Sequence, residues 1–166
     1  MYEAGGSGAG VAYSHNGGHT WRQPRHGLDR HYGWAVAVDP ALPEVWYASL
    51  SPSAFKAHSD GHAQAGIYRW AGVGDWTRLT GGLPDPLHDM PYALLTDPAA
   101  PGHLYAGLSG GDVWHTPDYG DGWHRLPFQF TTGIHRSLIR LPSGPVPAPG
   151  AASHYAAEAW NNVPVE

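Results

Sequence analysis

The sequence predicts an all-β protein made of repeated four-stranded units. Two stretches, WAVAVDPALPEVWYASL from Trp34 and YALLTDPAAPGHLYAGL from Tyr92, share one pattern. Each indicates an apolar strand, an Asp-Pro turn, and a second strand in which aromatic and small residues alternate. No stretch of similar strength has the i, i+3, i+4, i+7 spacing of an amphipathic helix. The composition agrees with a turn-rich β protein, because the 166 residues include 23 Gly, 16 Pro, 8 Trp and 9 Tyr.

A third and a fourth strand follow each of these pairs. We expect the third strands at Gly66 to Trp70 and at Asp112 to Thr116, and the fourth strands to begin at Trp76 and Trp123. A glycine-bearing turn separates the third strand from the fourth. Four short strands with a turn signal at every joint predict an antiparallel meander.

A repeat of roughly 50 residues with four strands is the unit of a β-propeller, in which blades stand around a central channel. We expect the last two strands of one blade at about 10–23, whole blades at about 33–79 and 90–126, and the first strand of a fourth blade at 137–141. The predicted fold class is therefore a β-propeller with an incomplete ring of about two and a half blades. The partial propeller is expected to span residues 1–141, with blade boundaries near 33, 80–91 and 128–136, and residues 142–166 to form a Pro- and Ala-rich tail.

A propeller ring needs roughly four to eight blades to close. We therefore expect a part of a longer propeller, a truncated gene product, or a chain that associates with partners through its open blade edges, since unpaired strand edges invite pairing.

The charge and the chain ends exclude several classes of partner. With nine Lys and Arg and a net charge of −5, the chain has no basic stripe for nucleic acid. No apolar run approaches the roughly 18 residues of a membrane span. The first residues, MYEAGGSGAG, do not resemble a signal peptide, which leaves the cytoplasm as the default expectation. The sequence gives no reason to expect a cofactor.

Two motifs of similar pattern occupy the turn between a third and a fourth strand. They are YSHNGGHTWRQP from Tyr13 and HTPDYGDGWHRLP from His115. An Asp or Asn side chain accepts backbone N–H groups within its own turn, glycine supplies a positive φ, and tryptophan offers a large ring for burial between blades. The matching positions are Ser14, Asn16, Gly18, Thr20 and Trp21 in the first motif, and Thr116, Asp118, Gly120, Gly122 and Trp123 in the second.

The motifs resemble the Asp-box, or bacterial neuraminidase repeat (BNR), whose pattern is S-x-D-x-G-x-T-W. This repeat occurs in sialidases and in many other propellers of the WD40-, YVTN- and BNR-like group. Asn16 replaces the aspartate in the first motif, and Gly122 replaces the threonine in the second. The middle blade keeps Trp76 but has no acidic residue at the box position. The resemblance implies that the boxes are structural and lie on the face away from the active site.

Meander topology places the remaining loops on the opposite face, which we name the candidate ligand face. These loops are residues 22–33, 51–65, 80–91, 109–112 and 128–136. Loop 51–65 is the long one, because 21 positions separate Tyr47 from Tyr68, against 9 between Tyr105 and Trp114. Long loops on a rigid scaffold often carry binding residues. The candidate ligand-binding residues on this face are Arg25, His26, Arg30, His31, Tyr32, Lys56, His58, His62, His88 and His135.

Two functions follow from this face. The favoured one is a non-catalytic scaffold that binds a glycan or a protein. The alternative, implied by the resemblance, is a sialidase-like glycoside hydrolase of exo-acting type, so the sequence leaves open whether the protein is an enzyme. A sialidase needs an arginine cluster, a Tyr–Glu pair and an Asp acid, and other glycosidases need two carboxylates. The face offers no Glu, and its weak catalytic candidates are Asp29, Asp60, Asp85 and Asp89.

A metal site is a third possibility that the sequence raises. The 12 histidines include pairs four residues apart, His15 with His19 and His58 with His62. Such spacing suits a metal on a helix face, but both pairs lie in predicted glycine-rich loops. We therefore expect no metal ligands.

Overall fold

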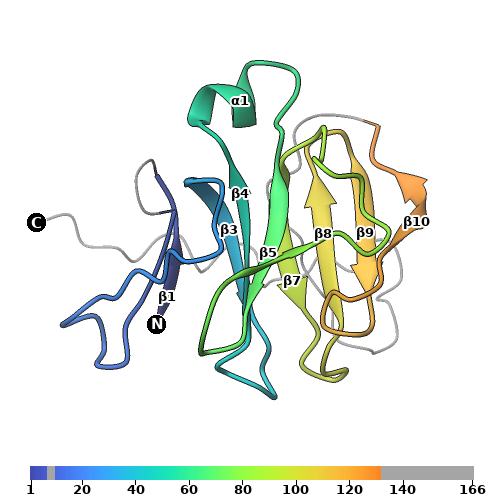
Figure 1. Cartoon of the computed structure of the whole chain (residues 1–166). Helices are drawn as coiled ribbons and strands as arrows, with labels where there is room; N and C mark the ends of the chain where they lie inside the picture. The colour runs from blue at the N-terminus through green and yellow to red at the C-terminus, as the bar shows by residue number, and fades with distance from the viewer. Residues whose placement is uncertain (7–9, 132–166) are drawn as a thin grey trace, which may run out of the picture.

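The computed structural model describes residues 1–6 and 10–131, and these form three antiparallel sheets that stand side by side (Figure 1). The middle sheet has the order β3-β4-β5-β6, with β3 at Tyr32–Val38, β4 at Trp46–Ser51, β5 at Gly66–Trp70 and β6 at Thr77–Leu79. The last sheet follows the same meander, with β7 at Pro91–Thr96, β8 at Leu104–Leu108, β9 at Asp112–Thr116 and β10 at His124–Gln129. The expected strand at 137–141, the tail at 142–166 and His135 lie outside the described residues.

The third strands β5 and β9 span the residues that the sequence predicts. The fourth strands begin one residue later than predicted, directly after Trp76 and Trp123. The backbone N–H groups of these tryptophans donate to the segment that joins their sheet to the preceding one: Trp76 to the carbonyl of His26 at 2.9 Å, and Trp123 to that of Gly81 at 2.6 Å. The tryptophans therefore belong to the joints between sheets rather than to the strand ladders.

In the described residues, the first sheet contains only part of the four-stranded pattern. It pairs β1, Tyr2–Ala4, with β2, Val11–Tyr13, and an isolated bridge joins Tyr13 to Arg22. The predicted pair of strands around 10–23 is therefore reduced to β2 and a single bridge. The sequence analysis did not predict strand β1, because the stretch around it is rich in glycine.

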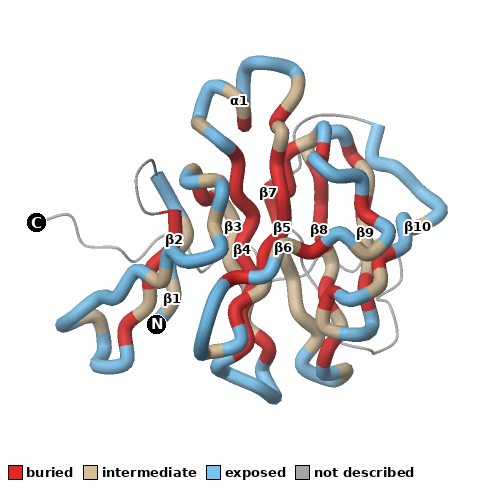
Figure 2. The backbone as a smooth tube through the Cα atoms, viewed as in Figure 1, coloured by how far each residue is buried: buried red, intermediate tan, exposed pale blue. Residues whose placement is uncertain are grey.

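Aromatic side chains fill the space between neighbouring sheets, and the loops at both ends remain exposed (Figure 2). Between the first and middle sheets, Trp46 packs edge-on against Trp70 and Trp76, with ring centroids 5.7 and 4.7 Å apart. Between the middle and last sheets, Tyr47 and Ile67 contact a cluster that includes Leu104. This face-to-face packing of four-stranded meanders is the arrangement expected of consecutive blades.

A buried carboxylate holds the lower ends of two sheets together. Asp39, 1% exposed, is the aspartate of the predicted Asp-Pro turn between β3 and β4. Its Oδ1 accepts the N–H groups of Ala41 and Leu42 at 2.9 and 3.0 Å. Its Oδ2 accepts the N–H of Gly102, in the corresponding turn of the next sheet, at 2.9 Å. One side chain therefore fixes both the turn and the spacing of the sheets.

The tryptophans of the turns differ in burial, and one prediction about them is wrong. Trp76 and Trp123 are 4% and 6% exposed, as expected for rings between blades, but Trp21 is 41% exposed. The backbone N–H groups of Trp76 and Trp123 donate to the segment that enters their own sheet from the preceding one. Among the described residues, no such segment lies beside Trp21.

The loops separate into two groups at opposite ends of the sheets. The turns β3–β4, β5–β6 and β7–β8 lie at the lower end in Figure 1, and the β4–β5 loop with the short helix α1, Ala54–His58, lies at the upper end. In the described part of the chain, no helix is long and apolar enough to cross a membrane. The upper end corresponds to the candidate ligand face.

Candidate functional site

The long β4–β5 loop begins with a single helical turn that the sequence analysis did not predict. Ser53 caps helix α1, because its Oγ accepts the N–H of Lys56 at 3.2 Å. Lys56 then forms an ion pair with Asp60 at 2.5 Å, four residues on. This pair joins the helix to the loop residue two positions beyond its end. A turn of five residues is too short to produce a recognisable hydrophobic period.

A chain of hydrogen bonds anchors this helix to the strands below it. Tyr92 Oη donates to the carbonyl of Ala57 at 3.3 Å and lies 2.7 Å from His58 Nδ1. His58 Nε2 lies 2.8 Å from Tyr32 Oη, so both ring nitrogens of His58 are within hydrogen-bond distance of a tyrosine hydroxyl. The ring of Trp34 lies 4.7 Å from that of His58, edge to face. His58 is therefore held in position by three aromatic side chains.

A cavity of about 220 Å³ opens beside this anchored histidine. It lies between α1, the loop after it, the segment that leads into β7, and the β8–β9 turn. Its volume is below the roughly 300 Å³ of the smallest drug-sized pockets. The cavity is therefore of a size for one small polar group, such as a single sugar ring. The lining residues are Lys56, Ala57, His58, Gly61, His62, Ala63, His88, Asp89, Tyr92 and Ser109.

The polar groups of the cavity are both donors and acceptors. His62 and His88 lie with ring centroids 4.6 Å apart, and His62 Nδ1 accepts the N–H of Gln64 at 3.2 Å, which leaves the proton of a neutral ring on Nε2. Ser109 Oγ donates to Asp89 Oδ1 at 3.3 Å. Lys56 is paired with Asp60. Among the described residues, the nearest basic group to Asp89 is His88, whose Nδ1 stands 3.8 Å from Asp89 Oδ1.

The other two candidate carboxylates belong to a separate network outside the cavity. Asp29 accepts hydrogen bonds from Tyr68, Arg30 and Arg78, and Arg78 also pairs with Asp85. Partial burial acts to raise the pKa of Asp29, but the hydrogen bond from Tyr68 and the two arginine charges outweigh it and hold that pKa below its usual value. A general acid needs a raised pKa, so Asp29 is suited to holding loops together rather than to donating a proton.

The structure divides the candidate ligand-binding residues into two groups. Lys56, His58, His62 and His88 line the cavity, and Tyr32 supports it through His58. Arg25, His26 and His31 are exposed on the segment between β2 and β3, away from the cavity lining, and Arg30 is engaged by Asp29 and by the carbonyl of Gln64 at 2.6 Å.

Sequence reasoning missed Tyr92 and Ser109 as members of the site. The sequence analysis treated Tyr92 only as part of a predicted strand. Its position at the upper end of β7 is the signal that could have identified it as a site residue. Ser109 lies in a short loop that was assigned to the right face but not singled out. Both reach the cavity because β7 and β8 are neighbours in one sheet.

The two glycine turns lie away from the cavity and show the same internal bonding. In the first, Asn16 Oδ1 accepts the N–H of Thr20 at 2.9 Å, and Ser14 Oγ accepts that of Gly18 at 2.9 Å. In the second, Asp118 Oδ1 accepts the N–H of Gly122 at 2.8 Å, and Thr116 Oγ1 accepts that of Gly120 at 3.1 Å.

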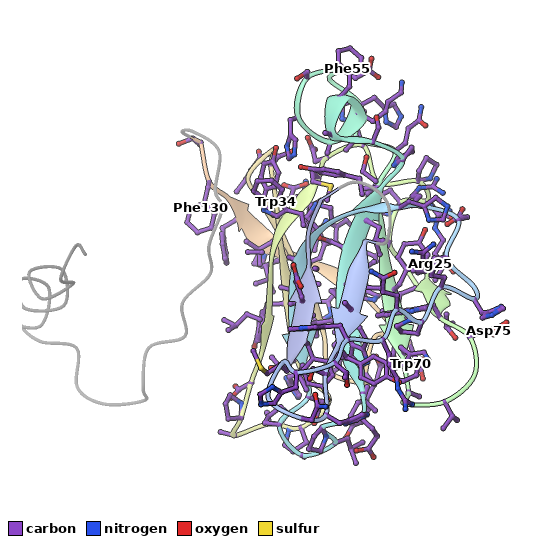
Figure 3. The ribbon with its side chains drawn as sticks, turned by 90° about the vertical axis from the view of Figure 1, so that its left-hand side faces the viewer. Arg25, Trp34, Phe55, Trp70, Asp75 and Phe130 are labelled. Carbon is purple, nitrogen blue, oxygen red and sulfur yellow. The ribbon has the colours of Figure 1, made fainter. Side chains whose placement is uncertain are left out.

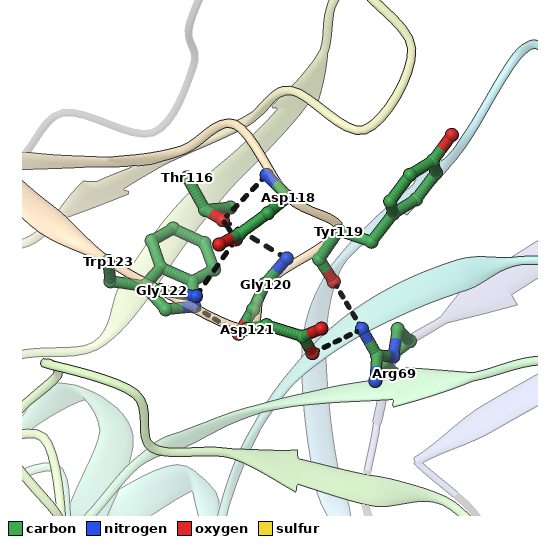
Figure 4. A network of polar contacts seen from close by, with 8 residues as sticks. All are labelled: Arg69, Thr116, Asp118, Tyr119, Gly120, Asp121, Gly122 and Trp123. Atoms are coloured by element: carbon green, nitrogen blue, oxygen red, sulfur yellow. Dashed lines mark hydrogen bonds and ion pairs between the residues drawn. The ribbon is translucent and has the colours of Figure 1, made fainter.

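The second turn also receives a bond from the neighbouring sheet. Arg69 of β5 donates to the carbonyl of Tyr119 and to Asp121, both at 2.9 Å (Figure 4). The hydrogen bonds from Thr116 and from the backbone N–H of Gly122 lower the pKa of Asp118. The carboxylate is thus kept ionised as an acceptor inside its own turn.

Histidines also gather at a second place: His103 directly precedes β8, His115 lies on β9 and His124 on β10. His115 uses both ring nitrogens, with Nε2 3.0 Å from His103 Nδ1 and Nδ1 3.1 Å from His124 Nε2. The bonds leave from opposite sides of the middle ring, so the three rings do not converge on one point. Within residues 1–6 and 10–131, no three histidine or carboxylate side chains are arranged to hold a metal ion.

Comparison with known proteins identifies the fold. No protein-family profile matches the sequence, and no curated protein is significantly similar to it. Among the solved structures 14 chains match. The crystal structure of an ancestral GH74 enzyme superposes with a TM-score of 0.55 at 16% identity, over 71% of this chain and 16% of that one. The GH74 xyloglucanase from Xanthomonas campestris gives a TM-score of 0.49 at 20% identity, over 72% and 19%.

This likeness confirms the predicted fold class. GH74 enzymes are β-propeller glycoside hydrolases, and the described sheets are consecutive blades of an all-β propeller. The chain spans less than a fifth of the length of either structure.

Proposed function

We propose that this propeller segment is a non-catalytic binding module that takes a neutral sugar ring of a glycan in the cavity beside α1. The observation that supports the proposal most directly is the cavity itself, with its imidazoles, a hydroxyl and a carboxylate on walls positioned by aromatic rings. Sugar hydroxyls need both donors and acceptors, and this lining offers both.

The charge of the lining favours a neutral glycan over an acidic one. Lys56 is already paired with Asp60, and no arginine is among the described lining residues. A sugar carboxylate would therefore meet Asp89 without a free cation to balance it.

The hydrolase alternative has less support. Glycosidases need two carboxylates on either side of the scissile bond, whereas Asp89 is the one carboxylate among the described lining residues. Asp29 and Asp85 belong to the arginine network, and Asp60 is paired with Lys56. The fold that this chain shares with a glycoside hydrolase makes glycans the first ligand class to test, without implying turnover.

We also propose that the two glycine turns are Asp-box repeats with a structural role. The support is their shared bonding, in which an Asx oxygen and a hydroxyl each accept a backbone N–H within the turn. Their position away from the cavity agrees with the role that the resemblance implies.

Calorimetric titration with neutral oligosaccharides (cellotetraose, maltotetraose, mannotetraose) and acidic ones (sialyllactose, trigalacturonate) tests the binding function. We expect at least one neutral probe to bind with an affinity that His88→Ala lowers about tenfold, because one good hydrogen bond contributes about 1 kcal/mol or slightly more. Phe55→Ala is the matched control. This exposed aromatic side chain lies on helix α1 beside the cavity but is not among the lining residues (Figure 3).

The same samples are analysed by chromatography for cleavage products. Binding without products is the expected result. Failure of every neutral probe at millimolar concentration would overturn the assignment, and cleavage abolished by Asp89→Asn would favour the hydrolase instead.

A further inference from the structure

We propose that the outward face of the last sheet is a docking surface for the first glycine turn of a second copy of this chain. The surface comprises Tyr105 with the histidines His103, His115 and His124. The contact would join copies head to tail, as one blade joins the next within the chain.

The joints inside the chain define what such a contact requires. At both joints the tryptophan after a glycine turn is buried against the segment that leads in from the preceding sheet: Trp76 Nε1 donates to the carbonyl of Pro24 at 2.9 Å, and Trp123 N donates to that of Gly81 at 2.6 Å. At the joint between the middle and last sheets, the preceding sheet also holds the turn itself, because Arg69 of β5 donates to the carbonyl of Tyr119 and to Asp121.

The two halves of one further joint are exposed in the described chain. Trp21 has the position of Trp76 and Trp123 in its turn, yet it is 41% exposed. At the other end, Tyr105 is half-buried, whereas its equivalent in the middle sheet, Tyr47, is 0% exposed. A second copy would supply the missing half to each.

Strand register shows which residues would meet. Tyr47 pairs with Arg69 across β4 and β5, and Tyr105 pairs with His115 across β8 and β9. His115 therefore has the position of Arg69, whose guanidinium holds Asp121 in the turn of the next sheet (Figure 4). Because the two glycine turns match residue by residue, the first turn has His19 at the position of Asp121.

The residue on the sheet face and the residue in the turn both change between the joint inside the chain and the exposed joint. Inside the chain, a cationic face meets an anionic turn. At the exposed joint, an imidazole face would meet a turn with an imidazole in place of the carboxylate. If the two turns exchanged partners, Asp121 would face histidines and His19 would face Arg69. The Arg69–Asp121 ion pair would then be lost. The first turn therefore suits the last sheet of another copy better than it suits the middle sheet. Such a contact joins unlike surfaces, which produces open chains or rings.

Sedimentation velocity of the purified 166-residue protein at pH 7.5, from micromolar to several hundred micromolar, tests this contact. We expect dimers and larger species for the wild type, and monomers for Trp21→Lys and for Tyr105→Lys, with folding checked by circular dichroism. An equimolar mixture of the two variants retains one intact joint and should form dimers but nothing larger. Phe55→Lys, on neither surface, should associate like the wild type.

A cross-link gives a second measurement that does not depend on the tyrosine variant. The sequence has no cysteine, so His19→Cys and His124→Cys each introduce a unique thiol. A short bismaleimide should join the two variants when they are mixed, and it should not join Phe55→Cys to His124→Cys. A wild type that stays monomeric at every concentration, or a mixture that neither dimerises nor cross-links, would overturn the proposal and indicate that another chain segment covers this face.

Discussion

Single side chains inside the glycine turns determine the local structure of this protein. Thr116 is fully buried and Asp118 is exposed, yet both serve one turn, because the hydroxyl donates to the carboxylate at 2.6 Å and accepts a backbone N–H. The sequence predicted this Asx chemistry, and the amide oxygen of Asn16 performs the same task in the first turn. What the acceptor contributes is therefore its oxygen rather than its charge.

Substitution of Asp118 separates these two contributions. Asp118→Ala removes the acceptor of the Gly122 N–H and should lower the free energy of unfolding by about 1 kcal/mol, or the melting temperature by roughly 2–4 °C. Asp118→Asn keeps an oxygen in the same place and should change the melting temperature much less. Equal losses in the two variants would show that the charge, not the hydrogen bond, holds the turn.

His115 makes the stability of the last sheet sensitive to pH. Burial, followed by the charges that His103 and His124 acquire, lowers the pKa of His115 from its ordinary 6.5. As pH falls, the unfolded chain binds a proton at this position before the folded one does, so folding loses stability from about pH 6.5 downward. The wild type should lose more thermal stability between pH 7.5 and 5.5 than His115→Gln does. An unchanged pH profile in the variant would contradict this assignment.

At the scale of elements, glycines at the joints allow sheets to approach each other. A Cβ on Gly82, which has a φ of +91°, would stand 2.4 Å from the carbonyl oxygen of Trp123, and one on Gly27 would stand 2.3 Å from that of Trp76. The same contact thus recurs at both joints. The sequence marked these glycines only as loop residues, because nothing local reveals a backbone that approaches from a strand more than 40 residues further on.

Gly82→Ala tests the close approach. The clash should destabilise the protein by about 1–3 kcal/mol, in addition to the roughly 1 kcal/mol of a left-handed alanine. Gly74→Ala is the matched control, because Gly74 also has a positive φ, +72°, but has no atom within 4 Å of an added Cβ. Chemical denaturation should give a clearly larger loss for Gly82→Ala, and similar losses would contradict a tight joint.

At the scale of the whole molecule, repetition made the fold predictable and the site less so. The strands β5 and β9 were predicted to the residue because glycine-bearing turns bound each strand. The cavity combines α1, the start of β7 and the β8–β9 turn, and these segments meet only when the meander closes. Helix α1 was missed because one helical turn has no measurable period, and the exposure of Trp21 depends on a neighbour rather than on its own motif.

The central claim is that the cavity beside α1 is the binding site, and the histidines provide a direct probe of it. Three of them, His58, His62 and His88, line the cavity, and three others, His103, His115 and His124, form the cluster on the last sheet. NMR spectra of the imidazole Cε1–H groups, recorded while a neutral tetrasaccharide is added, report on both sets at once. The account predicts saturable shifts in the first set and none in the second. Shifts confined to the second set, or absent from both at millimolar sugar, would contradict it.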